Sequence, residues 1–304
     1  MNISDRMRPI GNYMSTSAES SGPVLTRHRV RPEFAGLVAG IVGFQEWTNR
    51  PVIRRQVAGS LMPLVLSSGP ILDVVGLSHG RGIGRHASFI AGLMPGYATT
   101  RFDRVQECVQ IYLTPLGVVG LLGTPGRELA EAVVGLADAA PAFDDSFQDR
   151  LWATPTWPGR FDLIDRKLLA LLSRGHRLEP FVSWMWQQIE ATGGRARIGE
   201  LIGQTGWSER HAISRFTEQI GLGPKMAARV VRFERAHEAL RHDSSTNVAA
   251  RFGFSDQSHL IREVRRFAGV PPTTLNQTNP PTAHSAVGRA PSPESSGPAA
   301  CHER

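Results

Sequence analysis

One sequence pattern occurs twice in the C-terminal part of the chain. The stretch G-W-S-E-R-H-A-I-S-R-F-T-E-Q-I-G at 206–221 aligns with G-F-S-D-Q-S-H-L-I-R-E-V-R-R-F-A-G at 253–269. The openings match at an offset of 47 residues, and one extra residue in the second copy shifts the rest to 48. Each copy runs from a glycine through a serine and an acidic residue to a further glycine, as expected for a turn followed by a capped helix. The repeat therefore constrains this region to two copies of one short helical unit.

Each copy is expected to fold as helix, turn, helix. Apolar residues recur at three- and four-residue steps on both sides of each turn, which predicts one buried stripe per helix. The expected stripes are Ile198, Leu201 and Ile202, then Ala212, Phe216 and Ile220 in the first copy, and Val248, Ala249 and Phe252, then Leu260 and Val264 in the second. Gly206 and Gly253 are placed to stop the first helices in a left-handed conformation. Ser208 and Ser255 are expected to cap the second helices through their hydroxyls.

The second helix of each copy is the candidate DNA reader. A short helix after a tight turn fits the major groove, where its first residues reach the base edges. The candidate DNA-binding residues are Arg210, His211, Ile213, Ser214, Arg215 and Thr217 in the first copy, and Gln257, Ser258, His259, Ile261, Arg262 and Arg265 in the second. Gln257 can pair with adenine, and Arg262 with guanine or a phosphate. His211 and His259 either contact phosphates or pack at the edges of their helices.

A predicted helix at 224–241 joins the two copies. Pro224 suits a first helical turn, and Val230, Phe233 and Leu240 share one face. Its 18 residues would span about 27 Å, close to the roughly 34 Å between successive major grooves on one side of DNA. The segment therefore resembles a spacer between two groove-reading helices.

The charge of the chain is concentrated in the same region. The whole chain has a net charge of +7, and 195–277 contains 13 Lys or Arg against 8 Asp or Glu, so five of the seven excess positive charges lie there. A basic region that coincides with a repeated groove-reading unit favours a polyanionic partner over an ordinary solvated surface.

Residues 197–275 resemble the AraC/XylS family of transcription regulators. The resemblance is carried by S-E-R-H-A-I-S-R-F-T-E-Q-I-G-L-G-P-K, by the helix R-V-V-R-F-E-R-A-H-E-A-L and by G-F-S-D-Q-S-H-L-I-R-E-V-R-R-F-A-G-V-P-P. It implies that 210–217 and 257–265 enter the major groove. The chain departs from the family at Ala212 and Ser214, where a larger apolar residue and often an arginine are usual, so the second unit follows the pattern more closely.

The preceding part of the chain predicts a different architecture, so the fold class is α+β. Short apolar runs rich in β-branched residues, at 40–44, 61–66, 71–77, 88–93 and 105–113, predict a mostly antiparallel sheet or barrel. From Pro115 the spacing becomes helical, with one stripe through Leu129, Val133 and Leu136 and further helices at 161–173 and 179–191. The resemblance implies a regulatory role for about 30–190, with a small-molecule effector or a dimer partner.

The domain organisation follows from these shifts in pattern. We expect disordered tails at 1–22 and 278–304, a regulatory domain at 23–191 that is β-rich to about 113, and an all-α DNA-binding domain at 195–277. Neither a signal peptide nor a membrane span is indicated, and two distant cysteines suit a reducing cytoplasm.

An N-terminal domain with a phosphate-binding, metal-binding or catalytic site is the alternative. The stretch H-G-R-G-I-G-R-H at 79–86 lacks the Walker spacing and is interpreted as a glycine-rich loop or hairpin. His28 could complete a three-histidine metal site with His79 and His86, but isolated histidines more often pack or face solvent. Cys108 lies in an apolar strand pattern and is interpreted as a buried structural thiol. We expect no enzyme, metal or cofactor.

The sequence therefore predicts a sequence-specific regulator of transcription that binds double-stranded DNA and is gated by its N-terminal domain. RNA polymerase, a small-molecule effector and a second copy of the chain are the further partners considered. The competing hypothesis is a small-molecule-binding or enzymatic N-terminal domain that the C-terminal domain only tethers to DNA.

Overall fold

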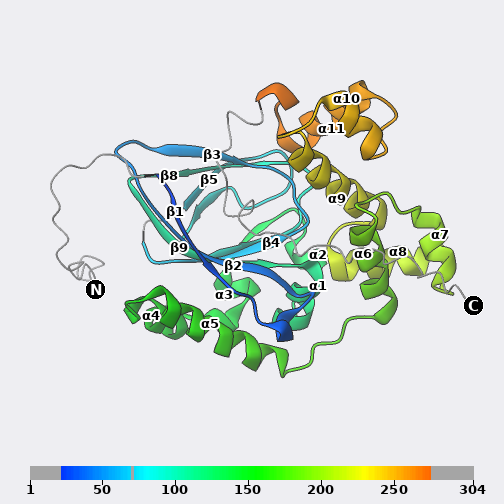
Figure 1. The fold of residues 1–304 in the computed structure, drawn as a ribbon. Coiled ribbons are helices and arrows are strands. Elements are labelled where there is room, and N and C mark those ends of the chain that lie inside the picture. Colours follow the sequence, from blue (N-terminus) through cyan, green and yellow to red (C-terminus); the bar gives the residue numbers. More distant parts are fainter. Residues whose placement is uncertain (1–21, 70–71, 275–304) are drawn as a thin grey trace, which may run out of the picture.

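The computed structural model describes residues 22–69 and 72–274, so the predicted tails lie outside the described residues except for Gly22. Two antiparallel sheets form the N-terminal part, with α4 (Asp145–Ala153) and α5 (Trp157–Leu172) below them and the remaining long helices to one side and above (Figure 1). The α+β class is confirmed, with a β-rich first part and an all-helical C-terminal part.

Ten strands of the described residues build the two sheets. They are β1 (Val24–His28), β2 (Val38–Trp47), β3 (Val52–Gln56), β4 (Met62–Ser67), β5 (Leu72–Leu77), β6 (Gly84–His86), β7 (Phe89–Ala91), β8 (Ala98–Phe102), β9 (Val105–Leu113) and β10 (Val133–Gly135). The larger sheet has the order β1-β2-β9-β4-β7-β10 and the smaller has the order β3-β8-β5-β6. All five predicted strand runs are confirmed, as β2, β4, β5, β7 and β9.

The larger sheet has two apolar faces. On β9, Val109 and Ile111 belong to the core shared with the helices, whereas Cys108 and Tyr112 belong to a second apolar cluster. Val74 of the smaller sheet belongs to the second cluster as well. Because side chains alternate along a strand, one face of the larger sheet supports the helices and the other faces the smaller sheet.

After β9 the chain forms short helical segments and one strand. These are α1 (Pro115–Gly117), η3 (Val118–Leu122), α2 (Gly126–Leu129), β10, α3 (Leu136–Ala139) and η4 (Pro141–Phe143); a further short turn, η2 (Pro32–Phe34), precedes β2. The predicted helical stripe through Leu129, Val133 and Leu136 is wrong, because α2 ends at Leu129 and Val133 pairs with Ala91 of β7. Consecutive valines favour a strand, and here they add one to the edge of the larger sheet.

The predicted helices at 161–173 and 179–191 are confirmed as α5 and α6 (Pro180–Ala191). The buried face of α6 includes Val182, Met185 and Trp186 and lies in the core shared with the C-terminal helices, where α6 packs against α8 (Glu209–Ile220) and α9 (Pro224–Ala239). The domain boundary placed after residue 191 stays a prediction.

The C-terminal part contains the two predicted units. The first consists of α7 (Ile198–Gln204) and α8, the second of α10 (Ser245–Arg251) and α11 (Gln257–Ala268), and α9 runs between them (Figure 1). The predicted spacer helix is thus confirmed. Within the described residues, no helix is both long and apolar enough to cross a membrane.

Candidate functional site

The turns of the two units follow the predicted pattern, with one correction. Gly206 and Gly253 have φ angles of 74° and 72°, which place both in the left-handed region. Ser208 accepts a hydrogen bond from the backbone N–H of His211 at 3.3 Å and so caps α8. In the second unit the cap is Asp256, not Ser255, because the extra residue of the second turn moves the helix start by one position.

Asp256 makes the second cap an anionic one. Its Oδ1 accepts a hydrogen bond from the backbone N–H of His259 at 2.6 Å. This backbone hydrogen bond is the main reason that the pKa of Asp256 lies below its usual value. The carboxylate lies at the N-terminus of α11, where the helix dipole favours negative charge.

The predicted buried stripes form the cores of both units. The residues of the second helices that were expected inside are fully buried: Ala212, Phe216, Ile220, Leu260 and Val264. In the first helices, Ile198, Leu201, Ile202, Val248 and Ala249 are buried, and Phe252 is half-buried. Gly221 and Gly269 then end α8 and α11 in left-handed conformations.

On α8, Arg210 and Ser214 are exposed. The other four candidates, His211, Ile213, Arg215 and Thr217, are half-buried. The ring of His211 stacks on Trp207 at a centroid distance of 4.4 Å, and the hydroxyl of Thr217 donates to the carbonyl of Ile213. The first unit thus presents a narrow free face, with its remaining candidates engaged by neighbours.

Arg215 is held by two carboxylates of the protein. Its Nε donates to Glu179 at 2.5 Å, and its Nη1 to Glu218 at 2.6 Å. The hydrogen bond to Glu179 is the main reason that the pKa of Arg215 is raised. Because Glu179 immediately precedes α6, this side chain joins α8 to the helix before it.

On α11, Gln257, Ser258, Arg262 and Arg265 are exposed, and His259 and Ile261 are half-buried. The ring of His259 lies against the turn, with Nδ1 3.2 Å from the hydroxyl of Ser255. The second unit therefore offers a broader polar face than the first.

The spacer α9 is tied to the second unit by an ion pair. The guanidinium of Arg229 donates to both oxygens of Glu263 on α11, at 2.6 and 3.1 Å. Glu263 is buried, and its hydrogen bond raises the pKa of Arg229. Arg232 lies over the ring of Phe254 at 4.9 Å, and burial lowers its pKa. Arg229 and Arg232 thus fix α11 and its preceding turn to α9.

The exposed indole of Trp207 was not among the candidates. It is 52% exposed and lies in the turn before α8, while its counterpart in the second unit, Phe254, is 6% exposed. The alignment of Trp207 with Phe254 was visible in the sequence. Phe254 belongs to the apolar core and lies under Arg232, whereas Trp207 contacts the rings of Phe181 and His211.

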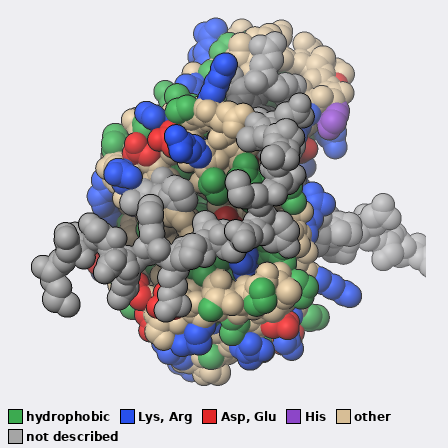
Figure 2. All heavy atoms as spheres, turned by 90° about the vertical axis from the view of Figure 1, so that its left-hand side faces the viewer, with side chains coloured by type: hydrophobic (Ala, Val, Ile, Leu, Met, Phe, Trp, Pro, Cys, Tyr) green, Lys and Arg blue, Asp and Glu red, His purple; other side chains and the backbone are tan. Residues whose placement is uncertain are grey.

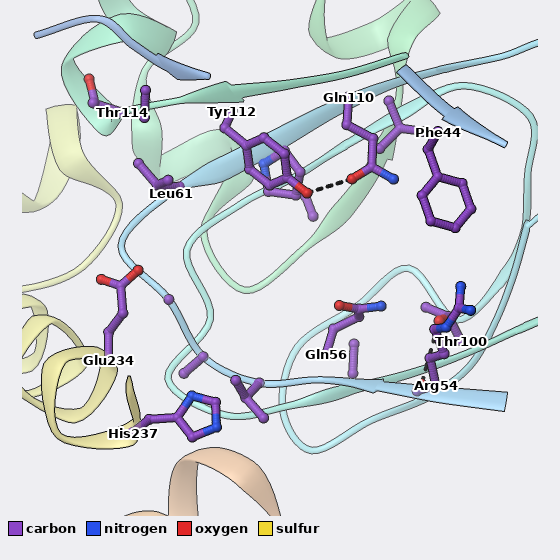
Figure 3. A pocket seen from close by; sticks show the side chains of 18 of the residues that line it. Phe44, Arg54, Gln56, Leu61, Thr100, Gln110, Tyr112, Thr114, Glu234 and His237 are labelled. Carbon is purple, nitrogen blue, oxygen red and sulfur yellow. Dashed lines mark hydrogen bonds between the residues drawn. The ribbon is translucent and has the colours of Figure 1, made fainter. Parts of the chain in front are cut away.

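A cavity of about 990 Å³ lies between the two sheets and reaches α9 (Figure 3). Tyr112 and Gln110 of β9 line one side, Arg54 and Gln56 of β3 the other, and Glu234 of α9 lies at one end (Figure 3). The hydroxyl of Tyr112 donates to Oε1 of Gln110 at 2.5 Å, and burial raises the pKa of Tyr112. The cavity was not predicted, although the alternation of Gln106, Gln110 and Tyr112 along one strand was a signal of a polar patch on an inner face.

The alternative N-terminal sites are not assembled. Residues 79–83 form a loop with positive φ at Gly80 and Gly82, and Gly84–His86 form β6, which pairs antiparallel with β5, so the stretch is a glycine-rich hairpin. Nε2 of His86 lies 2.8 Å from the carbonyl oxygen of Gly82. Nε2 of His28 lies 3.0 Å from Oδ2 of Asp165 on α5, and not in a cluster with His79 and His86. No group of three His, Cys, Asp or Glu suited to a metal ion occurs in the described part of the chain.

Cys108 is fully buried, and this burial raises the pKa of its thiol to about 12. A thiol that stays protonated is a poor nucleophile and metal ligand. The interpretation of Cys108 as a structural thiol is thus supported.

Charge is mixed on the face opposite the first unit. Figure 2 shows that face, with Lys and Arg side chains interspersed with acidic and apolar ones. On α11, Arg262 and Arg265 are both exposed.

Comparison with known proteins identifies the C-terminal domain. A family model described as a helix-turn-helix domain matches residues 201–278. The HTH-type transcriptional regulator Rv1931c of Mycobacterium tuberculosis is 34% identical over 82 residues, which are 26% of this chain and 32% of that protein. The match therefore covers about a third of the relative. The C-terminal domain is a helix-turn-helix domain of the AraC type, and the resemblance to AraC/XylS regulators is confirmed for it.

Two solved structures resemble the chain more distantly. The C-terminal domain of AraT, a response regulator from Geobacillus stearothermophilus, has 20% identity and a TM-score of 0.31, and covers 34% of this chain and 88% of its own. ToxT from Vibrio cholerae has 9% identity and a TM-score of 0.44, and covers 79% of this chain and 98% of its own.

Proposed function

We propose that this protein is a transcription regulator that binds double-stranded DNA in a sequence-specific way, with α8 and α11 as its two reading helices. The observation that carries the proposal is the pair of helix-turn-helix units on one spacer, each with a capped second helix. The spacer α9 has 16 residues, so it spans about 24 Å. This length is of the same order as the separation of about 34 Å between neighbouring stretches of major groove on one side of DNA.

We assign base reading mainly to the second unit. Gln257, Arg262 and Arg265 are exposed, which leaves their polar ends available to DNA. In the first unit, Arg210 and Ser214 take this role, while Arg215, His211 and Thr217 position α8 or contact phosphates. The remaining candidates, Ile213, Ser258, His259 and Ile261, complete the two surfaces.

The N-terminal domain is proposed to gate DNA binding because it contacts the C-terminal ends of both reading helices. Arg127 of α2 lies 3.4 Å from Glu218 of α8. The backbone N–H of Ala58, just after β3, donates to the carbonyl of Phe267 on α11 at 3.2 Å. A change in the N-terminal domain would therefore alter the position of α8 relative to α11. Because the two halves of a DNA site have a fixed spacing, such a change would alter DNA affinity.

The direct test is selection of preferred sites from a random duplex DNA library with the full chain, at low and at moderate salt. Two enriched sequence elements about one helical turn apart, roughly 10 base pairs, are the expected result. Retention of any duplex at low salt with no enriched sequence would mean that phosphate contacts alone hold DNA, and the proposal would be abandoned.

A further inference from the structure

Trp207 is exposed but held in place. Among the described residues of the C-terminal part, no other large apolar side chain is exposed. Its ring stacks on His211 of α8 at a centroid distance of 4.4 Å, and the ring of Phe181, in the first turn of α6, lies 6.1 Å away. The indole therefore lies alongside the first turn of α8, with about half of its surface open to solvent.

This position is on the reading side of α8. His211 directly follows Arg210, and it is a surface neighbour of Ser214 because residues three apart lie side by side on a helix. Arg210 and Ser214 are the two exposed candidates of the first unit. The first residues of a reading helix are the ones that reach base edges. The indole thus extends the narrow free face of the first unit toward its turn.

The second unit shows that folding does not require an exposed ring at this position. Phe254, the counterpart of Trp207, is buried in the apolar core under Arg232. Its unit nevertheless has the same left-handed glycine in the turn and a capped second helix. Since apolar surface gains free energy when it leaves water, a partner that covers the indole would be stabilised by this contact.

The chemistry of the major groove selects the group that fits. Base edges there present hydrogen-bond donors and acceptors and one apolar group, the C5-methyl of thymine. An indole has a single N–H donor and is otherwise apolar. Glu209 is exposed at the first position of α8, and its charge disfavours a phosphate beside the turn. The thymine methyl therefore suits this ring better than the DNA backbone does.

We infer that Trp207 is a specificity-determining residue, which reads a thymine in the DNA element of the first unit by packing its indole against the C5-methyl group. The inference rests on the proposed function, because it requires α8 to lie in the major groove. It gives the first unit a third contact beside Arg210 and Ser214.

The test replaces each thymine of the selected duplex in turn by deoxyuridine, which lacks only the C5-methyl group. We expect the affinity of the native full chain to fall by about fourfold at one position that Trp207 contacts. Trp207→Ala should bind the thymine and uracil forms of that position equally and should keep the native response at every other position. The same response to every replacement in Trp207→Ala and in the native chain would overturn the inference.

Two further variants separate a contact from a structural role. Trp207→Ala should weaken binding to the selected duplex by about tenfold, whereas Trp207→Phe keeps an apolar ring and should retain the preference for thymine over uracil. Trp47→Ala truncates an indole that is 44% exposed on β2, far from α8 in sequence and fold, and should bind as the native chain does.

The outcomes distinguish this inference from the proposed function. If folded Trp207→Ala loses discrimination at all positions of the element, then the ring only positions α8 and the thymine contact is rejected. Unchanged DNA affinity of Trp207→Ala would reject it as well and would leave a protein partner for the exposed ring. Both results leave the proposed function standing. A library selection that enriches no sequence would instead refute the proposed function, and the thymine contact with it.

Discussion

The ion pair between Arg229 and Glu263 gives the sharpest prediction about how the second unit is held. Glu263 lies on α11 with its side chain 9% exposed, and Arg229 lies on α9 with its side chain 32% exposed. Both carboxylate oxygens accept hydrogen bonds from the guanidinium. Glu263→Gln removes the charge with little change in shape and leaves a half-buried arginine without its counter-ion.

The loss in free energy of unfolding expected for Glu263→Gln lies between the values for exposed and for fully buried ion pairs. Exposed pairs contribute about 0 to 1 kcal/mol, and loss of one partner of a fully buried pair costs about 3 to 5 kcal/mol. Since Arg229 keeps partial contact with water, we expect a loss of about 2 kcal/mol, which corresponds to roughly 30-fold in the unfolding equilibrium.

The measurement is urea unfolding followed by circular dichroism, with a matched control. Glu200→Gln breaks the ion pair with Arg197. The side chain of Arg197 is 82% exposed and that of Glu200 is 63% exposed, so the loss in free energy of unfolding should be less than about 0.5 kcal/mol. The double variant Arg229→Met, Glu263→Leu should recover most of the stability lost in Glu263→Gln, because it leaves no buried charge unpaired. Indistinguishable effects of Glu263→Gln and Glu200→Gln would refute the view that this pair fixes α11 to α9.

Three further predictions concern α11 and its cap. Arg262→Ala should weaken binding to the selected duplex by about 1 to 3 kcal/mol and relax discrimination at one position; unchanged discrimination, measured by competition with mismatched duplexes, would remove its base-reading role. Leu260→Asp should unfold the second unit, since it buries an unpaired charge, and an unaltered thermal melt would contradict the core assignment. Asp256→Asn keeps a capping side chain but loses the charge. Because the pKa of Asp256 in the folded state is lowered from 3.8, the stabilisation by the charge is complete above pH 3.8, and the stability difference between native and variant should shrink as the pH falls below 3.8 and through the lower folded pKa. A difference that does not depend on pH would contradict this reasoning.

The helix-turn-helix units could be predicted in detail because their determinants are local. The positive φ of Gly206 and Gly253 and the buried stripes of the second helices follow from spacing and residue type alone. The cap at Asp256 instead of Ser255 was missed because both residues are good caps, and only the start of α11 decides between them.

The remaining errors and omissions depend on contacts between distant residues. Val133 fits a helical stripe by spacing, but the edge of β7 offers it backbone partners that no helix pattern reveals. The cavity is likewise set by how far apart the two sheets lie. The pairing of Arg229 with Glu263 could be predicted from the sequence only once α9 and α11 were known to pack together.

The central claim is that one spacer, α9, holds two DNA-reading units at a fixed separation. The most direct test is the affinity of the full chain for the selected duplex, compared with duplexes lengthened between the two sequence elements by about half a helical turn and by about one full turn, roughly 5 and 10 base pairs. The account predicts that both insertions reduce affinity to that of a single element, because a rigid helix cannot follow either change. Recovery of affinity at the full turn would indicate a flexible connection, and affinity unchanged by either insertion would mean that one unit alone reads the site; both results would contradict the account.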